Sequence, residues 1–200
     1  MRIVAGSAKG MRLAPVPASV RPISDRAREG LFSSLGPGAL DGANVLDLFA
    51  GTGAAGIEAL SRGAASATFV DRAPAAIDTI KRNLTITRFV ARGEIHPAGI
   101  GRFLERDDRP GAPYDVVICD PPYDLGSPEL DDVLRELGRG WLRDDVWTVV
   151  LTRGHKSSTP VIPLHWAIAR RLRYGDSLVF VFRPRGSAEE PANDPAYDPA

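Results

Sequence analysis

The sequence has few of the residues that build cross-links or metal sites. Its 200 residues include one cysteine and three histidines. Because Cys119 has no second cysteine to pair with, an internal disulfide and a cysteine-based metal site are both excluded. His96, His155 and His165 stand singly and lack the spacing of metal ligands, so we expect no bound metal.

Long apolar runs are also missing. No stretch approaches the roughly 18 apolar residues that a membrane-spanning helix needs, and no basic segment followed by an apolar one opens the chain. We therefore expect a cytoplasmic protein without a signal peptide. The hydrophobic content of 44% predicts one ordinary globular unit with a substantial core.

The formal net charge is zero, but the charges are unevenly distributed. Residues 1–30 carry six cations and two acids, whereas residues 184–200 carry one cation and four acids. For any one of these early cations, exposure on a solvated surface is about as good an explanation as contact with phosphate. Their grouping ahead of a folded core favours an arm that contacts phosphate. The candidates are Arg2, Lys9, Arg12, Arg21, Arg26 and Arg28.

Three parts of the chain are expected from its composition. Residues 1–40 predict a basic hairpin followed by a helix that Gly36-Pro37-Gly38 ends. Residues 41–183 form the main domain. Prolines, small residues and acids after residue 183 cannot bury enough surface to fold, so residues 184–200 are expected to be a disordered tail.

Strand and helix patterns alternate through the main domain. This order predicts an α/β fold with a doubly wound, mostly parallel sheet, closed by an antiparallel hairpin. The expected strands are residues 45–48, 67–70, 94–96, 116–119 and 146–151, followed by hairpin strands 167–172 and 178–182. Ligands of such sheets bind at the carboxyl ends of the strands, where Asp47, Asp71 and Asp120 fall.

Residues 45–56 combine a buried strand, a glycine-rich turn and a helix of small residues. The bare amides of such a loop face a ligand. The spacing Gly51-x-Gly53-x-x-Gly56 also fits a dinucleotide fingerprint. Asp47 favours another ligand, because its carboxylate would repel a pyrophosphate and attract the ammonium and sulfonium groups of S-adenosylmethionine. We therefore interpret the stretch as a methyltransferase cofactor loop.

Asp71 lies eighteen residues after Gly53, at the end of the second strand. An acid at about this spacing can accept hydrogen bonds from both ribose hydroxyls of an adenosine-containing cofactor. Ribose binding would serve NAD equally well. The alternative is a helix N-cap ahead of Pro74. Asp71 therefore supports a nucleoside ligand without deciding which one.

Asp120-Pro121-Pro122-Tyr123 follows the fourth strand. The two prolines stiffen the chain where it meets solvent, so that the Asp120 carboxylate and the Pro121 carbonyl are aimed at one point. Two acceptors placed in this way can hold both N–H groups of an exocyclic amine, and its lone pair is then free to attack a methyl group. Tyr123 offers a face on which a base can stack. The alternative is a rigid loop.

These residues resemble a known family. Residues 47–64, the segments Arg2–Gly6 and Arg21–Phe32, and Asp120–Tyr123 are similar to motifs of the RsmD family, the bacterial guanine-N2 methyltransferases of small-subunit ribosomal RNA. The resemblance covers residues 1–183, and the first 32 residues narrow it to this family. It implies a Rossmann-like class I methyltransferase fold with a seven-stranded sheet and an N-terminal β-hairpin extension.

The resemblance also implies S-adenosylmethionine as cofactor and one guanine of 16S ribosomal RNA as substrate, in the small subunit or its assembly intermediate. Asp120, Pro121, Pro122 and Tyr123 would be catalytic, and the arginines and lysine of residues 1–30 would hold RNA phosphates. The implied cofactor-binding residues are Asp47, Phe49, Ala50, Gly51, Thr52, Gly53, Asp71, Arg72, Gly99 and Ile100. We expect a monomer with no membrane or metal partner.

Three positions depart from the family pattern. Gly99 stands where an Asp or Asn often lies near adenine, Ile23 stands in place of a threonine, and the fifth strand ends in Leu151-Thr152-Arg153 without the acid often found there. The alternatives are a DNA adenine-N6 methyltransferase, a protein-amine methyltransferase and an NAD-type dinucleotide-binding protein. The DNA enzyme is disfavoured because only about 40 residues precede the core, too few for a domain that reads bases.

Overall fold

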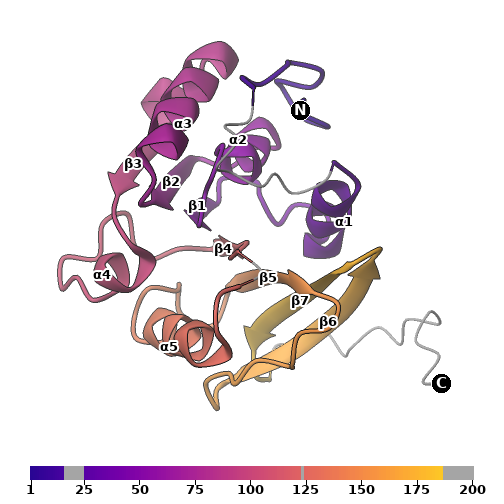
Figure 1. Ribbon diagram of the computed structural model, residues 1–200, viewed down its shortest axis with the longest axis vertical. Helices are drawn as coiled ribbons and strands as arrows, with labels where there is room; N and C mark the ends of the chain where they lie inside the picture. Colours follow the sequence, from indigo (N-terminus) through magenta and orange to yellow (C-terminus); the bar gives the residue numbers. More distant parts are fainter. Residues whose placement is uncertain (16–24, 123, 187–200) are drawn as a thin grey trace.

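The computed structural model describes residues 1–15, 25–122 and 124–186, without the side chains of residues 25–27. One seven-stranded sheet runs through this part of the chain, in the order β3-β2-β1-β4-β5-β7-β6 (Figure 1). Neighbouring strands from β3 to β5 are parallel, and β7 is antiparallel to both β5 and β6. The expected fold class, a mostly parallel sheet with a C-terminal antiparallel hairpin, is confirmed.

The strands lie close to their expected positions. They are β1 Asn44–Leu48, β2 Ser66–Asp71, β3 Gly93–Pro97, β4 Val116–Cys119, β5 Thr148–Gly154, β6 Trp166–Tyr174 and β7 Ser177–Pro184. The fifth strand begins and ends later than predicted. Val146 is 71% exposed and lies outside the sheet, whereas Thr152 and Arg153 are buried and pair with β7.

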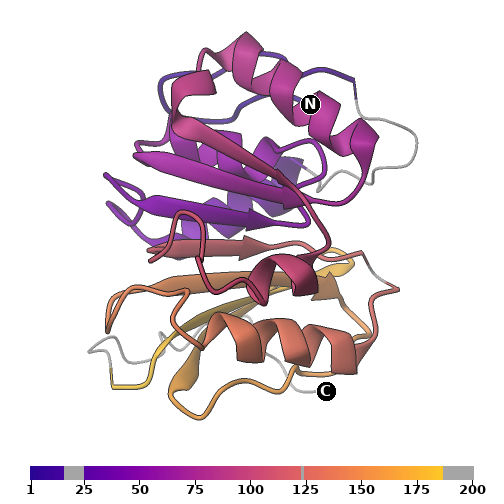
Figure 2. The same ribbon diagram turned by 90° about the vertical axis from the view of Figure 1, so that its left-hand side faces the viewer.

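Helices cover both faces of the sheet, as Figures 1 and 2 show. They are α1 Asp25–Leu35, α2 Ala54–Ser61, α3 Pro74–Thr87, α4 Ile100–Leu104 and α5 Ser127–Leu137, with a short 3-10 turn at Val90–Arg92. The first three contribute to one hydrophobic cluster and the last two to a second. Successive residues of a strand point to opposite faces, so Val45 enters the first cluster and Leu46 the second.

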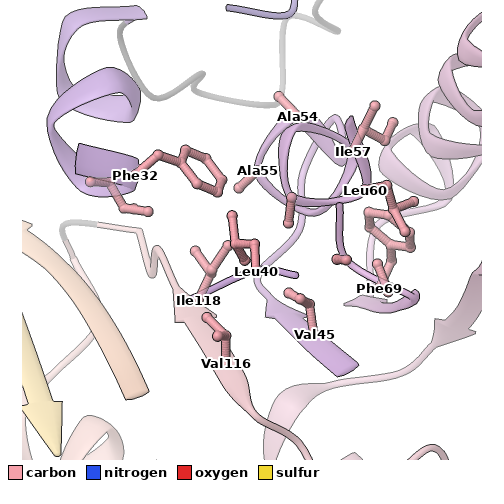
Figure 3. Close-up of a cluster of buried hydrophobic side chains, with 14 of the residues drawn as sticks. Phe32, Leu40, Val45, Ala54, Ala55, Ile57, Leu60, Phe69, Val116 and Ile118 are labelled. Atoms are coloured by element: carbon pink, nitrogen blue, oxygen red, sulfur yellow. The ribbon is translucent and has the colours of Figure 1, made fainter. Parts of the chain in front are cut away.

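The first cluster sets how closely α2 approaches the sheet. Figure 3 shows Phe69 of β2 beside Leu60 of α2, and Val45 of β1 below the helix. At Gly56 a Cβ atom would lie 2.4 Å from Cε1 of Phe69, a side chain with no exposed surface. Because such a contact is impossible without movement, a glycine at this position lets the helix that carries the loop pack tightly against β2.

The first fifteen residues form the predicted hairpin, with an antiparallel bridge between Arg2 and Arg12. The hairpin docks on α2. The amides of Val4 and Ala5 donate to the two carboxylate oxygens of Glu58 at 2.8 and 2.9 Å, and the amide of Ala8 donates to Oγ of Ser61 at 2.9 Å. Both acceptors lie in the C-terminal half of α2, so the hairpin is held away from the glycine loop that precedes this helix.

Asn83 of α3 makes a second connection to the hairpin. Its Oδ1 accepts from the amide of Ala14 at 2.7 Å, and its Nδ2 donates to the carbonyl of Thr52 at 2.8 Å. The side chain is fully buried. One residue therefore joins the end of the N-terminal hairpin to the glycine loop. The division into an extension, a core and a disordered tail stays a prediction, and residues 187–200 lie outside the described residues.

Candidate active site

The carboxyl ends of β1, β2 and β4 lie side by side, because these three strands are neighbours in the sheet. Each strand brings one of the predicted acids, Asp47, Asp71 and Asp120. Asp47 belongs to β1, Asp71 is the last residue of β2, and Asp120 follows β4. The negative charges of Asp120 and Asp71 both act on Asp47. These three predicted site residues thus meet at one rim of the sheet.

The glycine loop turns sharply between β1 and α2. Three of its residues have positive φ angles, Phe49 at 59°, Gly51 at 56° and Gly53 at 72°. Backbone bonds fix the turn, from the amide of Ala50 to the carbonyl of Val70 at 3.1 Å and from the amide of Gly53 to the carbonyl of Ala50 at 2.7 Å. Glycine adopts such angles without steric cost, which explains why Gly51 and Gly53 occupy these two positions.

Asp47 lies beneath this loop with 2% of its surface exposed. Its Oδ2 accepts a hydrogen bond from the amide of Gly56 at 2.8 Å, which ties the strand to the first turn of α2. Burial raises the pKa of Asp47 well above its usual value. The Gly56 bond opposes that rise, and the charges of Asp120 and Asp71 add to it. A cation at the rim would relieve this accumulation of negative charge.

Asp71 binds the backbone of both the glycine loop and the segment that leads into α3. Its Oδ2 accepts from the amide of Gly51 at 2.8 Å, and its Oδ1 accepts from the amide of Ala73 at 2.9 Å. The N-cap position of α3 is Ala73, so Asp71 does not occupy it. Since each carboxylate oxygen has two lone pairs, both oxygens can still accept a bond from a hydroxyl group.

The remaining predicted cofactor residues surround the same rim. Gly99 is the N-cap of α4, and a Cβ atom placed there would meet nothing within 4 Å. Ile100 is 8% exposed and packs into the second cluster. Arg72 is exposed, and Thr52 is buried. The amide of Ala98 donates to the carbonyl of Asp71 at 3.1 Å, which brings the segment before Gly99 against the end of β2.

Asp120 is held by a residue that the sequence did not point out as functional. Oγ1 of Thr152, in β5, donates a hydrogen bond to Oδ1 of Asp120. Thr152 is 4% exposed. The neighbouring pair Cys119 and Leu151 are register partners of β4 and β5, so Thr152 stands directly beside Asp120. This bond orients the carboxylate, and we therefore predict a positioning role for Thr152.

Replacing Thr152 by valine tests this positioning role. Valine keeps the shape but removes the hydroxyl donor, so we expect the catalytic rate at saturating substrates to fall about 10-fold, the effect of losing roughly 1.4 kcal/mol of orientation. Thr152→Ser keeps the donor and should stay near the wild-type rate. Single-turnover assays measure both variants. Equal rates for Thr152→Val and wild type would show that Asp120 needs no such support.

The segment after Asp120 begins with a buried residue and then turns outward. Pro121 is buried and Pro122 is exposed, and the carbonyl of Pro122 accepts from the amide of Leu125 at 3.0 Å. Tyr123 lies outside the described residues. Cys119 is fully buried, and its pKa is raised chiefly by that burial. A thiol held protonated in this way is a poor nucleophile, in agreement with a packing role in the strand.

The predicted phosphate-contacting residues divide into three groups. Arg2, Lys9 and Arg12 are exposed on the hairpin. Arg21 and the side chain of Arg26 lie outside the described part of the structure. Arg28 requires a correction, because its side chain is fully buried, donates to the carbonyl of Arg2 at 2.5 Å and lies 3.9 Å from Glu58. Arg28 supports the hairpin and does not present its charge to RNA.

Two features are absent from residues 1–15, 25–122 and 124–186. Within these ranges no three or more histidine, cysteine or acidic side chains are grouped so that they could hold a metal ion. Within the same ranges no helix is long and apolar enough to cross a membrane.

Comparison with known proteins identifies the family. The family described as Conserved hypothetical protein 95 matches residues 1–183, which include all the helices and all of the sheet except the last residue of β7. This family is the RsmD family, and the chain belongs to it. A relative within the family, Ribosomal RNA small subunit methyltransferase D of Escherichia coli (strain K12), is 33% identical over 195 residues, which cover 96% of this chain and 94% of that protein.

Two further RsmD-family comparisons agree with the fold and the length of the chain. The Putative rRNA methyltransferase YlbH of Bacillus subtilis (strain 168) is 32% identical over 93% of this chain and 100% of that protein. The solved structure of Putative methyltransferase yhhF from Escherichia coli has a TM-score of 0.80 and 32% identity, and covers 94% of this chain and 99% of that one. The family match, which begins at residue 1, includes the hairpin as well as the sheet.

Proposed function

We propose that this chain transfers a methyl group from S-adenosylmethionine to the exocyclic N2 amine of a guanine in 16S ribosomal RNA. The observation that carries the proposal is the position of Asp120. It lies at the end of β4, beside the glycine loop of β1, with its carboxylate held by Thr152. Membership of the RsmD family and the name of the Escherichia coli relative, Ribosomal RNA small subunit methyltransferase D, support ribosomal RNA as the substrate.

The rim fits a cationic nucleoside cofactor. Asp47 has its pKa raised by burial and by two neighbouring carboxylates, so a bound cation would be stabilised there. Gly51 and Gly53 place no side chain over the loop, and their amides donate to Asp71 and to the carbonyl of Ala50. Asp71 keeps acceptor capacity for ribose hydroxyls, and a Cβ atom at Gly99 would meet nothing within 4 Å. When bound, S-adenosylmethionine would supply an electrophilic methyl group on a sulfonium. A pyrophosphate would instead add negative charge beside three carboxylates, which argues against NAD.

Asp120 and the Pro121 carbonyl hold the target amine. Both are acceptors, and an exocyclic amine offers two N–H donors. Holding both hydrogens orients the nitrogen lone pair towards the methyl group and stabilises the positive charge that develops on nitrogen. The proton then leaves an amine that has become strongly acidic, so no strong base is needed. Tyr123 is proposed to stack on the guanine, a contact worth about 1–3 kcal/mol.

We further propose that the partner is the small ribosomal subunit or its assembly intermediate, and that the enzyme acts as a cytoplasmic monomer. Its exposed hairpin cations are few for tight binding of bare RNA, which favours a ribonucleoprotein surface. Arg2, Lys9 and Arg12 remain the proposed contacts of the hairpin with phosphate.

Tritiated methyl transfer tests the function. Small subunits from a strain that lacks this gene are incubated with the protein and labelled S-adenosylmethionine, and the RNA is digested to nucleosides. We expect the label in N2-methylguanosine. Label in N6-methyladenosine, or transfer to DNA but not to subunits, would contradict the proposal and favour an adenine-N6 enzyme.

The raised pKa of Asp47 predicts a pH dependence of cofactor binding. A cation beside the carboxylate lowers its pKa, so binding releases a proton at pH values between the liganded and the raised ligand-free pKa. Affinity for S-adenosylmethionine should therefore rise with pH through that window and level off above the ligand-free value. S-adenosylhomocysteine lacks the sulfonium charge and should show a smaller rise.

Isothermal titration in two buffers with different heats of ionisation measures the released proton. Asp47→Asn is the matched variant, because its carbonyl oxygen can still accept from Gly56 but has no proton to release. It should bind both ligands with little dependence on pH. If wild type and Asp47→Asn gave the same pH profile, another group would be responsible.

A further inference from the structure

The β6–β7 hairpin carries a second concentration of positive charge, separate from the N-terminal hairpin. Residues 166–186 include five arginines and a single acid, Asp176, and Asp176 lies 3.5 Å from His155. Arg171 and Arg173 are exposed. Burial, and to a smaller extent the charge of Arg170, lowers the pKa of Arg183. Because the chain as a whole has zero net charge, the excess of arginines over acids in this hairpin is a local concentration of positive charge.

The register of the sheet places Arg171 and Arg173 at the same height along the strands as the residues next to Asp120. Cys119 pairs with Leu151, Leu151 with Phe180, and Phe180 with Arg171. One residue row therefore leads from the position before Asp120 to Arg171. A second row leads from Arg153 through Leu178 to Arg173. With about 4.8 Å between neighbouring strands, β6 lies about 14 Å from β4, a short span for an RNA strand.

Arg171 and Arg173 lie on the same face of the sheet as Cys119, and Asp120 and Thr152 alternate to the other face. Phe180 and Leu178 belong to the cluster under α4 and α5, and the guanidinium of Arg171 lies over the Phe180 ring at 5.5 Å. On that face Arg153 donates to the carbonyl of Leu125 at 3.2 Å, in the loop that follows Asp120. The exposed Arg171 and Arg173 thus lie at the edge of the sheet face on which the buried Arg153 holds the loop after Asp120.

We propose that Arg171 and Arg173 bind phosphates of the ribosomal RNA strand next to the target guanine. This inference rests on the proposed function, since it assigns a second contact surface for the same substrate. Arginine stacked on an aromatic ring keeps its N–H edge directed outward, a geometry suited to phosphate. The contact would hold the strand while the target base is turned into the rim.

A protective role is the other explanation for charge on β6, because it is the last strand of the sheet. Charged side chains on an edge strand prevent pairing with other chains. Charges of either sign serve that purpose, however, whereas this hairpin has five arginines against one acid. A second copy pairing along β6 would bring arginines towards arginines, which disfavours self-association there.

The test compares Arg171→Gln/Arg173→Gln with wild type in binding and methylation of small subunits. We expect the KM for subunits to rise at least 10-fold, with kcat at saturating subunits unchanged. The slope of log affinity against log salt should fall by about 1.4 to 1.8, the value for two lost phosphate contacts. Arg171→Lys/Arg173→Lys keeps both charges and should restore most of the slope.

Lys81→Gln/Arg82→Gln is the matched control. It removes two exposed cations from α3, which packs on β2 and β3 towards the other edge of the sheet. This variant should keep the wild-type KM, and all variants should bind S-adenosylhomocysteine equally. An unchanged KM in Arg171→Gln/Arg173→Gln, or a wild-type dimer that forms through β6, would overturn the inference. Absence of subunit methylation by the wild type would overturn both the inference and the proposed function.

Discussion

Asp120→Ala is expected to lose about 10²–10³-fold in methyl-transfer rate while binding S-adenosylmethionine as the wild type does. The carboxylate touches the reacting amine in the proposed mechanism, and removal of a group that stabilises transition-state charge costs about this much. It lies across the rim from the groups proposed to hold ribose and adenine, so cofactor affinity should change little. The removed negative charge also lowers the repulsion on Asp47.

Asp120→Asn is the informative companion variant. Its amide oxygen can still accept one bond, but its NH₂ group cannot hold an amine hydrogen or accept from Thr152. Single-turnover rates and titration with S-adenosylhomocysteine separate chemistry from binding. We expect the single-turnover rate of Asp120→Asn to be nearly as low as that of Asp120→Ala. A wild-type rate in Asp120→Ala would refute the role of this carboxylate and with it the proposed grip on the amine.

Glu58→Ala is expected to destabilise the fold by about 3–5 kcal/mol, the range for removal of one partner of a buried charged pair. The Glu58 carboxylate has no exposed surface. It accepts from the amides of Val4 and Ala5 and from Nε of Arg62, and it lies 3.9 Å from Nε of the buried Arg28. Without it, the hairpin loses its attachment to α2.

Urea unfolding measures this loss. Glu129→Ala, an exposed acid of α5, is the control and should change the free energy of unfolding by no more than about 0.5 kcal/mol. A loss below 1 kcal/mol in Glu58→Ala would mean that the hairpin and Arg28 are held by other contacts. The rim does not include Glu58, so the fraction that stays folded should retain cofactor binding.

The sheet and the rim were predictable because their signals are local. Continuous apolar runs indicate buried parallel strands, and a glycine loop after such a run indicates the ligand end of the sheet. Asp47, Asp71 and Asp120 follow from strand ends alone. The closing hairpin was also visible, since its two strands flank Tyr174-Gly175-Asp176.

Thr152 could not be found in this way. Its role depends on the register between β4 and β5, which are separated by more than 25 residues of chain that include α5. The departure from the family pattern at Leu151-Thr152-Arg153 marked the right position but gave no role for it. Only the pairing of the strands shows that the hydroxyl meets Asp120.

Arg28 was named from the sequence, but the role predicted for it is wrong. A cation among other cations predicts a solvated, phosphate-contacting residue, yet its partner Glu58 lies 30 positions further along the chain in α2. A signal did exist in Glu58 itself. It is the only charged residue of a helix made of alanine, glycine, isoleucine, leucine and serine, and a lone acid in such a helix requires a buried partner.

The bonds that Asp47 and Asp71 make to the glycine loop have a consequence for ligand affinity. The amides of Gly51 and Gly56 are already fixed by protein carboxylates, so the turn holds its shape before any ligand arrives. A cofactor that enters meets a rigid receptor, and little chain entropy is lost on binding. The affinity of the cofactor then depends on charge and fit at the rim, because no binding free energy is lost in ordering the loop.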